Sequence, residues 1–83
     1  MLYTYEAGQN ESIPVVFLHG GGLSSRAWEP VIERLPEFHC LAPDLPQQGR
    51  SRAIPFSVEV SAREVAEVIR QRVPGGQTHI VAH

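Results

Sequence analysis

The chain has 83 residues, with seven basic residues, all arginine, against nine acidic ones, which gives a net charge of −2. The charges form no block of one sign, so neither nucleic acid nor a membrane surface is expected as a partner. No segment approaches the length of a membrane span, and Cys40 has no second cysteine with which to form an internal disulfide, so we expect a cytoplasmic protein.

Two strands are predicted first. Residues 2–6 alternate weakly between apolar and polar side chains, which favours an antiparallel edge strand, and residues 7–11 are predicted to form a polar turn. Residues 15–18, Val-Val-Phe-Leu, are an unbroken apolar run. Such a run is typical of a strand that is buried on both faces of a parallel sheet.

A glycine turn follows this strand directly. Gly20, Gly21 and Gly22 let the backbone turn sharply and let its N–H groups approach a ligand, and Ser24 and Ser25 supply caps for a following helix. A strand, a glycine turn and a helix N-terminus in succession leave unpaired N–H groups at one place. Such a place suits a negative charge.

Three interpretations of this turn were compared. A P-loop is excluded because its motif needs a lysine, which the chain lacks. A dinucleotide-binding fingerprint would use Gly20 and Gly22 but has Ser25 in place of its third glycine, although Asp44 lies where a ribose-binding acid is expected. The third interpretation is an oxyanion hole, in which a backbone N–H stabilises the charge that develops on a carbonyl oxygen during acyl transfer.

The remaining elements alternate between helix and strand. Helical spacing begins at Ser25 and is stopped by Pro36, a second parallel strand is predicted over residues 38–42, and a loop over residues 45–56. A further helix begins at Ser57 or at Ser61 and ends at residues 74–76, and residues 78–82 are predicted to form a third, buried parallel strand. The order of these elements indicates an α/β protein.

Three stretches resemble a known family. Residues 19–28, His-Gly-Gly-Gly-Leu-Ser-Ser-Arg-Ala-Trp, resemble the His-Gly turn of the α/β-hydrolase fold. Residues 42–51, Ala-Pro-Asp-Leu-Pro-Gln-Gln-Gly-Arg-Ser, resemble its Asp-Leu-Pro-Gly-His-Gly-Arg-Ser segment, and residues 78–83, Thr-His-Ile-Val-Ala-His, resemble the strand that leads into its nucleophile elbow. The resemblance implies a mostly parallel sheet flanked by helices, with residues 1–83 as the N-terminal portion of a single, incomplete domain.

The resemblance also implies roles for individual residues. Gly21 is expected to offer its backbone N–H to the oxyanion, with Gly22 as the fallback donor, and Leu23 and Trp28 are candidates for the substrate pocket. The residues expected to shape the site without reacting are His19, Gly20, Asp44 and His83. Gln47 and Gln48 depart from the family's Gly-His, and a positive φ at Gln47 would cost about 1 kcal/mol because it is not glycine.

His83 corresponds to the residue that precedes the family's nucleophile. The nucleophile, the triad acid, the triad histidine and the lid are therefore expected beyond residue 83, and the 83-residue piece alone is expected to be inactive. His39 and His79 flank strands and are expected to be surface or strand-end residues rather than ligands. No His, Cys and carboxylate cluster has metal-ligand spacing, so neither a metal nor another cofactor is expected.

The resemblance implies a serine hydrolase that transfers the acyl group of a small ester, or of a related carbonyl compound, to water. The partner of these residues would be the remainder of their own hydrolase domain. Within the family, a dehalogenase-like enzyme with an aspartate nucleophile and a lyase remain alternatives. Outside it, a nucleotide-binding Rossmann-type domain and a non-catalytic binding module remain.

Overall fold

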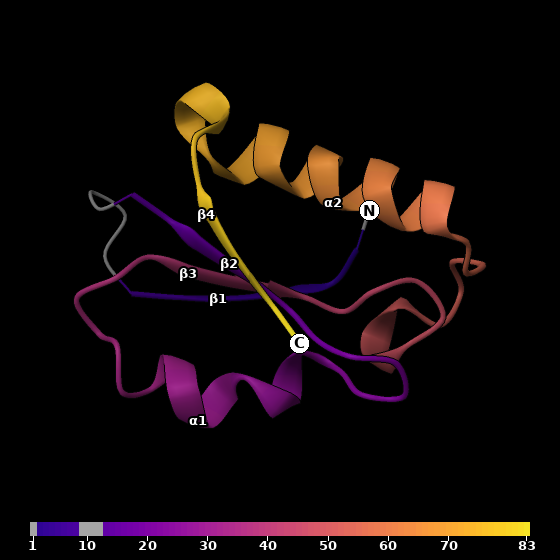
Figure 1. Ribbon diagram of the computed structural model, residues 1–83, viewed down its shortest axis with the longest axis horizontal. Coiled ribbons are helices and arrows are strands. Elements are labelled where there is room, and N and C mark those ends of the chain that lie inside the picture. Colours follow the sequence, from indigo (N-terminus) through magenta and orange to yellow (C-terminus); the bar gives the residue numbers. More distant parts are fainter. Residues whose placement is uncertain (1, 9–12) are drawn as a thin grey trace.

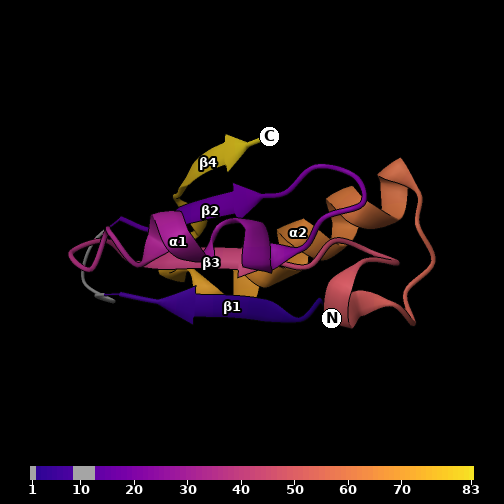
Figure 2. The same cartoon turned by 90° about the horizontal axis from the view of Figure 1, so that it is seen from below.

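A computed structural model describes residues 2–8 and 13–83, and these residues include one four-stranded sheet. Its strands are β1 (Thr4–Ala7), β2 (Val15–Leu18), β3 (Cys40–Pro43) and β4 (His79–Ala82). They lie in the order β1-β3-β2-β4, as Figure 2 shows. β1 is antiparallel to β3, whereas β2 is parallel to both β3 and β4, so the predicted mostly parallel α/β fold is confirmed.

Helices cover both faces of this sheet. The 3-10 helix η1 (Ser25–Ala27) and the short helix α1 (Glu29–Ile32) lie on one face, and α2 (Val58–Arg72) lies on the other (Figure 1). Two further 3-10 helices, η2 (Gly49–Ser51) and η3 (Pro74–Gly76), lie in the connections before and after α2. Within the described ranges, no helix is long and apolar enough to cross a membrane.

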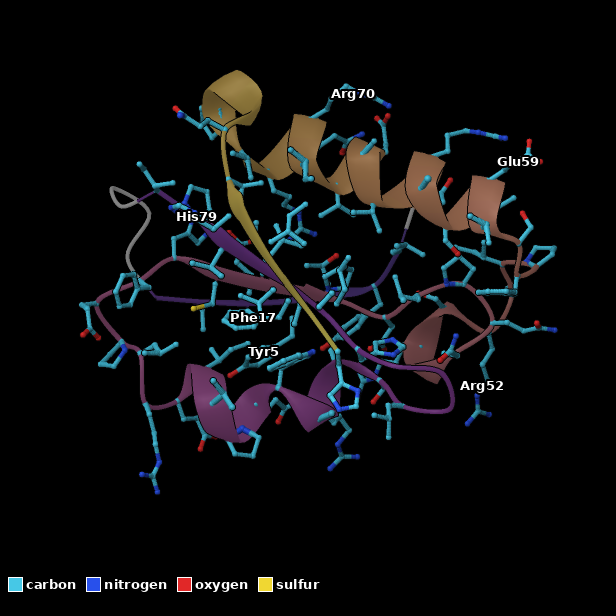
Figure 3. The ribbon with its side chains drawn as sticks, viewed as in Figure 1. Tyr5, Phe17, Arg52, Glu59, Arg70 and His79 are labelled. Atoms are coloured by element: carbon cyan, nitrogen blue, oxygen red, sulfur yellow. The ribbon has the colours of Figure 1, made fainter. Side chains whose placement is uncertain are left out.

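The core has two layers because successive side chains of a strand point to opposite faces of the sheet. Phe17 packs with Ile32 on the face of α1, and Figure 3 shows Phe17 and Tyr5 between the sheet and that helix. Val16 and Leu41 pack with Val73 on the face of α2. Burial of each such side chain contributes about 1.5–3 kcal/mol. The outer side of α2 carries polar side chains, including Glu59 and Arg70 (Figure 3).

The helix predicted from Ser25 to Pro36 is shorter and broken. η1 ends at Ala27, Trp28 separates it from α1, and α1 ends at Ile32. The interruption has a local cause, since Pro30 has no N–H with which to continue a helical hydrogen-bond ladder from η1. Pro30 instead lies in the first turn of α1, where a missing N–H has no cost.

The sequence offers two serines, Ser57 and Ser61, as the start of α2. The helix begins at Val58, and the Ser57 hydroxyl caps it by accepting a hydrogen bond from the Val60 N–H at 3.0 Å. The hydroxyl oxygen of Ser61 is buried and has no hydrogen-bond partner among the described residues. Ser57 is therefore the N-cap, and the capping box predicted from Ser61 is wrong.

The predicted strands are confirmed with shifted bounds, but the expectation that the last strand is buried is wrong. β4 is exposed along its whole length, including Ile80 at 54%, because it pairs only with β2 and no described helix covers it. Of the two positions expected for His39, surface or strand end, it has the second: it lies directly before β3, where its side chain is buried and pairs with Glu6 of the neighbouring strand β1. The polar turn predicted at 7–11 lies mostly outside the described residues.

Candidate functional site

The glycine turn lies beside the end of β4. In the parallel pair β2 and β4, Leu18 is opposite Ala82, and the His83 N–H continues the ladder by donating to the Leu18 carbonyl at 3.1 Å. A Cβ atom on Gly20 would lie only 3.0 Å from Nδ1 of His83. Figure 2 shows the C-terminus beside the end of β2. The turn after His19 and the residue His83 therefore occupy the same edge of the sheet, as expected for neighbouring parallel strands.

His19 joins the turn to the loop after β3. Its buried imidazole donates from Nδ1 to the Gly20 carbonyl at 2.8 Å, and its Nε2 accepts from the Leu45 N–H at 3.0 Å. Because Nε2 is an acceptor, the ring is neutral with its proton on Nδ1. Both nitrogens are thus engaged with backbone groups, which leaves neither of them for proton transfer in this arrangement.

Asp44 directly follows β3 and holds two loops together. Its buried carboxylate accepts from the Ser25 N–H at 2.6 Å and from the Arg50 N–H at 2.8 Å. Gly49 packs directly against it, since a Cβ atom there would lie 2.4 Å from Asp44 Oδ2. Both carboxylate oxygens accept backbone hydrogen bonds, an arrangement that orients the loops around the site.

The N–H groups of the turn differ in their partners. The turn is closed by a hydrogen bond of 3.2 Å from the Leu23 N–H to the Gly20 carbonyl. The Gly22 N–H donates to the side-chain oxygen Oε1 of Gln48 at 3.0 Å. The Gly21 N–H has no hydrogen-bond partner within residues 2–8 and 13–83. Of the two predicted donors, only Gly21 has an N–H that is open to a ligand.

A small cavity of about 220 Å³ lies under this edge, on the α1 side of the sheet. The Trp28 indole in its wall packs against Phe17 with ring centroids 5.0 Å apart. The indole nitrogen of Trp28 is buried and has no hydrogen-bond partner in the part of the chain that the structure describes. Five of the predicted site residues thus share one cavity, whose lining is His19, Gly20, Leu23, Ala27, Trp28, Val31 and His83.

Other candidate chemistry is weak in this chain. Burial raises the pKa of the Cys40 thiol, as does the nearby charge of Glu37, so Cys40 has little thiolate character at neutral pH. Among the residues with described positions, no group of three or more His, Cys, Asp or Glu side chains is arranged to hold a metal ion.

The family model described as alpha/beta hydrolase fold matches residues 13–83. The chain belongs to the α/β-hydrolase fold family. This membership agrees with the resemblance of all three sequence motifs and removes the Rossmann-type domain as an alternative.

Sequence relatives place this α/β-hydrolase chain near several enzymes. It is 36% identical over 72 residues to a Haemophilus influenzae protein named as a 2-succinyl-6-hydroxy-2,4-cyclohexadiene-1-carboxylate synthase, covering 86% of this chain and 29% of that protein. It is 38% identical over 74 residues to a pimeloyl-[acyl-carrier protein] methyl ester esterase of Yersinia pseudotuberculosis, covering 88% of this chain and 27% of the esterase. The chain thus spans less than a third of the length of these curated relatives.

Solved structures share the same fold. A loop variant of haloalkane dehalogenase DbeA from Bradyrhizobium elkanii has a TM-score of 0.84 and 29% identity, with 96% of this chain and 27% of that chain covered. Cfl2 from Burkholderia cenocepacia has a TM-score of 0.80 and 32% identity, with 99% of this chain and 29% of that chain covered. The α/β-hydrolase fold of the 83 residues therefore agrees with both.

Sequence reasoning does not predict the hydrogen bond between Gln48 and Gly22. Gln48 was singled out only as a departure from the family's histidine, and nothing in the sequence indicated that its side chain reaches Gly22, 26 positions earlier. The only available signal was that departure, next to a turn whose amides were already of interest. The assignment of Gly21 as the oxyanion donor stays a prediction.

Proposed function

We propose that this chain forms the N-terminal part of a serine hydrolase that transfers the acyl group of a small ester to water. In this proposal the residue after His83 is a serine on a tight strand-to-helix turn, and the turn at Gly21 supplies an oxyanion donor. The observation that carries the proposal is the open Gly21 N–H at the same sheet edge as His83. The esterase among the relatives supports the choice of an ester substrate.

The proposed chemistry divides between this chain and the segment beyond it. The serine oxygen attacks the ester carbonyl carbon, its proton passes to a histidine beyond residue 83, and the carbonyl electron pair moves onto the oxygen. The Gly21 N–H donates to that oxygen as its charge develops. Such a donor typically contributes about 10² to 10³ in rate because it is fixed before the reaction begins. The intermediate then collapses, and the alcohol leaves with the proton that the histidine returns to it, so that an acyl-serine remains. Water, deprotonated by the same histidine, attacks the acyl-serine, and collapse of this second intermediate releases the acid and restores the serine.

A second candidate is a dehalogenase-like enzyme, which the similarity to the Bradyrhizobium dehalogenase favours. Its nucleophile after His83 would be an aspartate, whose carboxylate would displace a halide from carbon. No oxyanion forms on the substrate in that displacement step. The serine hydrolase and the dehalogenase-like enzyme therefore differ in the identity of the residue directly after His83. A third candidate, a lyase, differs from both in the reaction that it catalyses.

Labelling of the intact protein with a fluorophosphonate probe tests the proposal. We expect one covalent adduct per chain, located by mass spectrometry on a serine directly after His83, together with hydrolysis of short-chain aryl esters. A protein pretreated with the probe is the control and should lose that activity. An active intact protein without an adduct, or with aspartate at that position, would favour the dehalogenase-like candidate.

A further inference from the structure

The turn that carries Gly21 and Gly22 has little packing to hold its shape. A Cβ atom added at either glycine would meet no other described atom within 4 Å. Gly22 also has a φ of +79°, a backbone conformation that residues other than glycine rarely adopt. Because side chains do not wedge this turn in place, its conformation depends on its hydrogen bonds.

Three hydrogen bonds of this turn are in the described structure. The His19 imidazole donates from Nδ1 to the Gly20 carbonyl at 2.8 Å and accepts from the Leu45 N–H, so it anchors the start of the turn to the loop after β3. The Leu23 N–H to Gly20 carbonyl bond closes the turn locally at 3.2 Å. The bond from the Gly22 N–H to Gln48 Oε1, at 3.0 Å, ties it to the loop after β3. Beyond the anchor at Gly20, the bond to Gln48 is the one that fixes where the Gly22 end of the turn lies relative to the sheet edge.

Gln48 presents its side chain from a well-held backbone. Its own N–H donates to the Leu45 carbonyl at 3.0 Å, and its carbonyl accepts from the Ser51 N–H at 2.9 Å. The preceding residue, Gln47, has a φ of +68° and donates its N–H to the Ser51 carbonyl at 2.9 Å. The carboxamide of Gln48 therefore extends from a loop that is itself closed by backbone hydrogen bonds.

We infer that Gln48 is a positioning residue of the oxyanion turn. It engages the Gly22 N–H, holds the turn at the sheet edge, and leaves the Gly21 N–H for the substrate. This inference rests on the proposed acyl transfer and adds to it the residue that decides which glycine acts as donor. Gln48 does not touch the reacting atoms itself.

The chemistry of a carboxamide suits this task better than that of a carboxylate. Both accept a hydrogen bond from Gly22, but a carboxylate would place a full negative charge beside the developing oxyanion. A thioether of similar length accepts hydrogen bonds only weakly. Two substitutions therefore separate the two properties of Gln48, which are that it accepts a hydrogen bond and that it is uncharged. Gln48→Glu keeps the acceptor and adds a charge, whereas Gln48→Met stays uncharged and removes the strong acceptor.

The kinetic test compares three variants of the intact protein on a short-chain aryl ester. We expect Gln48→Met to lower kcat about tenfold with KM within about twofold, because the turn loses its tether but the pocket keeps its shape. Gln48→Glu should lower kcat by about tenfold or more, and the ratio of its kcat to that of the wild type should rise as the glutamate protonates at acid pH. Gln47→Met makes the same chemical change at an exposed neighbour and should leave kcat within about twofold.

A purely structural tether predicts a different result, because Gln48→Glu would then keep both the hydrogen bond and the wild-type kcat. An increase of kcat in Gln48→Met would show that Gln48 blocks the donor and that Gly22 serves the oxyanion. Either outcome overturns the inference.

Amide hydrogen exchange at Gly22 can be measured whether or not the protein hydrolyses esters. It therefore tests this inference separately from the proposed function. We expect faster exchange at Gly22 in Gln48→Met than in the wild type and in Gln47→Met. Unchanged exchange would overturn the inference even in an active enzyme. If the wild type hydrolyses no ester, the proposed function fails, and faster exchange would still support the tether from Gln48 to Gly22.

Discussion

The Asp44 carboxylate accepts a hydrogen bond from the Ser25 N–H at 2.6 Å and thereby joins the end of β3 to the start of η1. Its second oxygen accepts from the Arg50 N–H at 2.8 Å. Asp44 and Ser25 lie 19 positions apart, so their hydrogen bond orients one loop against another at the edge that carries the glycine turn.

Replacement of Asp44 by asparagine should destabilise the fold. Asparagine keeps one acceptor oxygen but places an NH₂ group opposite a backbone N–H, so one buried hydrogen bond is lost and a donor is left unpaired. We expect a loss of about 1–3 kcal/mol in the free energy of unfolding, measured by urea denaturation. Glu33→Gln, which removes an exposed carboxylate, is the control and should change stability by less than about 0.5 kcal/mol. Equal effects of the two variants would contradict the role of Asp44.

Gly49 and Gly75 offer a matched pair of substitutions. Both have positive φ, at +53° and +81°, but a Cβ atom on Gly49 would lie 2.4 Å from Asp44 Oδ2, whereas one on Gly75 would meet nothing within 4 Å. Each alanine variant therefore incurs the backbone strain, about 1–2 kcal/mol, and only Gly49→Ala adds a steric clash. We expect Gly49→Ala to lower the urea midpoint clearly more than Gly75→Ala does. Equal midpoints would show that the Asp44 loop yields easily.

Glu6 makes stability sensitive to acid. Burial raises the pKa of its carboxyl, but hydrogen bonds with His39 and Arg72, each at 2.6 Å, outweigh burial and hold that pKa below its usual value. A depressed pKa in the folded state stabilises the fold above the unfolded value, about pH 4.3, and this contribution is lost as the pH falls through the folded pKa. We expect Glu6→Gln to be less stable than the wild type at pH 7.

The difference between Glu6→Gln and the wild type should shrink as the pH falls below about 4.3. Urea denaturation of both proteins across the acid range measures it. A difference that stays constant down to the lowest pH would mean that the charge on Glu6 contributes nothing to the stability of the fold.

The Gly21 N–H should matter for catalysis. Gly21→Pro removes the N–H, and we expect kcat to fall by about 10² to 10³. Gly21→Ala keeps the N–H, and its added Cβ atom would meet nothing within 4 Å, so the difference between the two variants isolates the donor. Circular dichroism checks that both variants fold. If both variants lose the same share of kcat, the oxyanion donor lies elsewhere.

The 83-residue chain by itself should self-associate. β4 exposes an unpaired edge with apolar side chains, including Ile80 at 54% and Val81 at 40% exposure, and such an edge is a template for pairing with another chain. We expect oligomers or aggregates in size-exclusion chromatography with light scattering. A monodisperse monomer with a sharp cooperative melt would refute this prediction.

Features that depend on neighbouring residues could be predicted from the sequence. The apolar run at 15–18 predicts β2, because an uninterrupted apolar strand is stable only when both of its faces are covered. The departure from glycine at Gln47 raised the question of a positive φ without deciding it, and the structure gives a φ of +68° there. Because β2 and β4 are parallel neighbours, the glycine turn and His83, which follow them directly, lie at one edge of the sheet.

Contacts between residues far apart in the sequence were decided by the tertiary structure alone. The break between η1 and α1 is caused by Pro30, which is visible in the sequence. The burial of His39, in contrast, depends on its contact with Glu6. The role proposed for Gln48 likewise depends on its hydrogen bond with Gly22. The strand β4 has the apolar pattern of a buried strand but is exposed. The pattern shows that its side chains favour burial, whereas burial itself depends on which other elements pack against the strand.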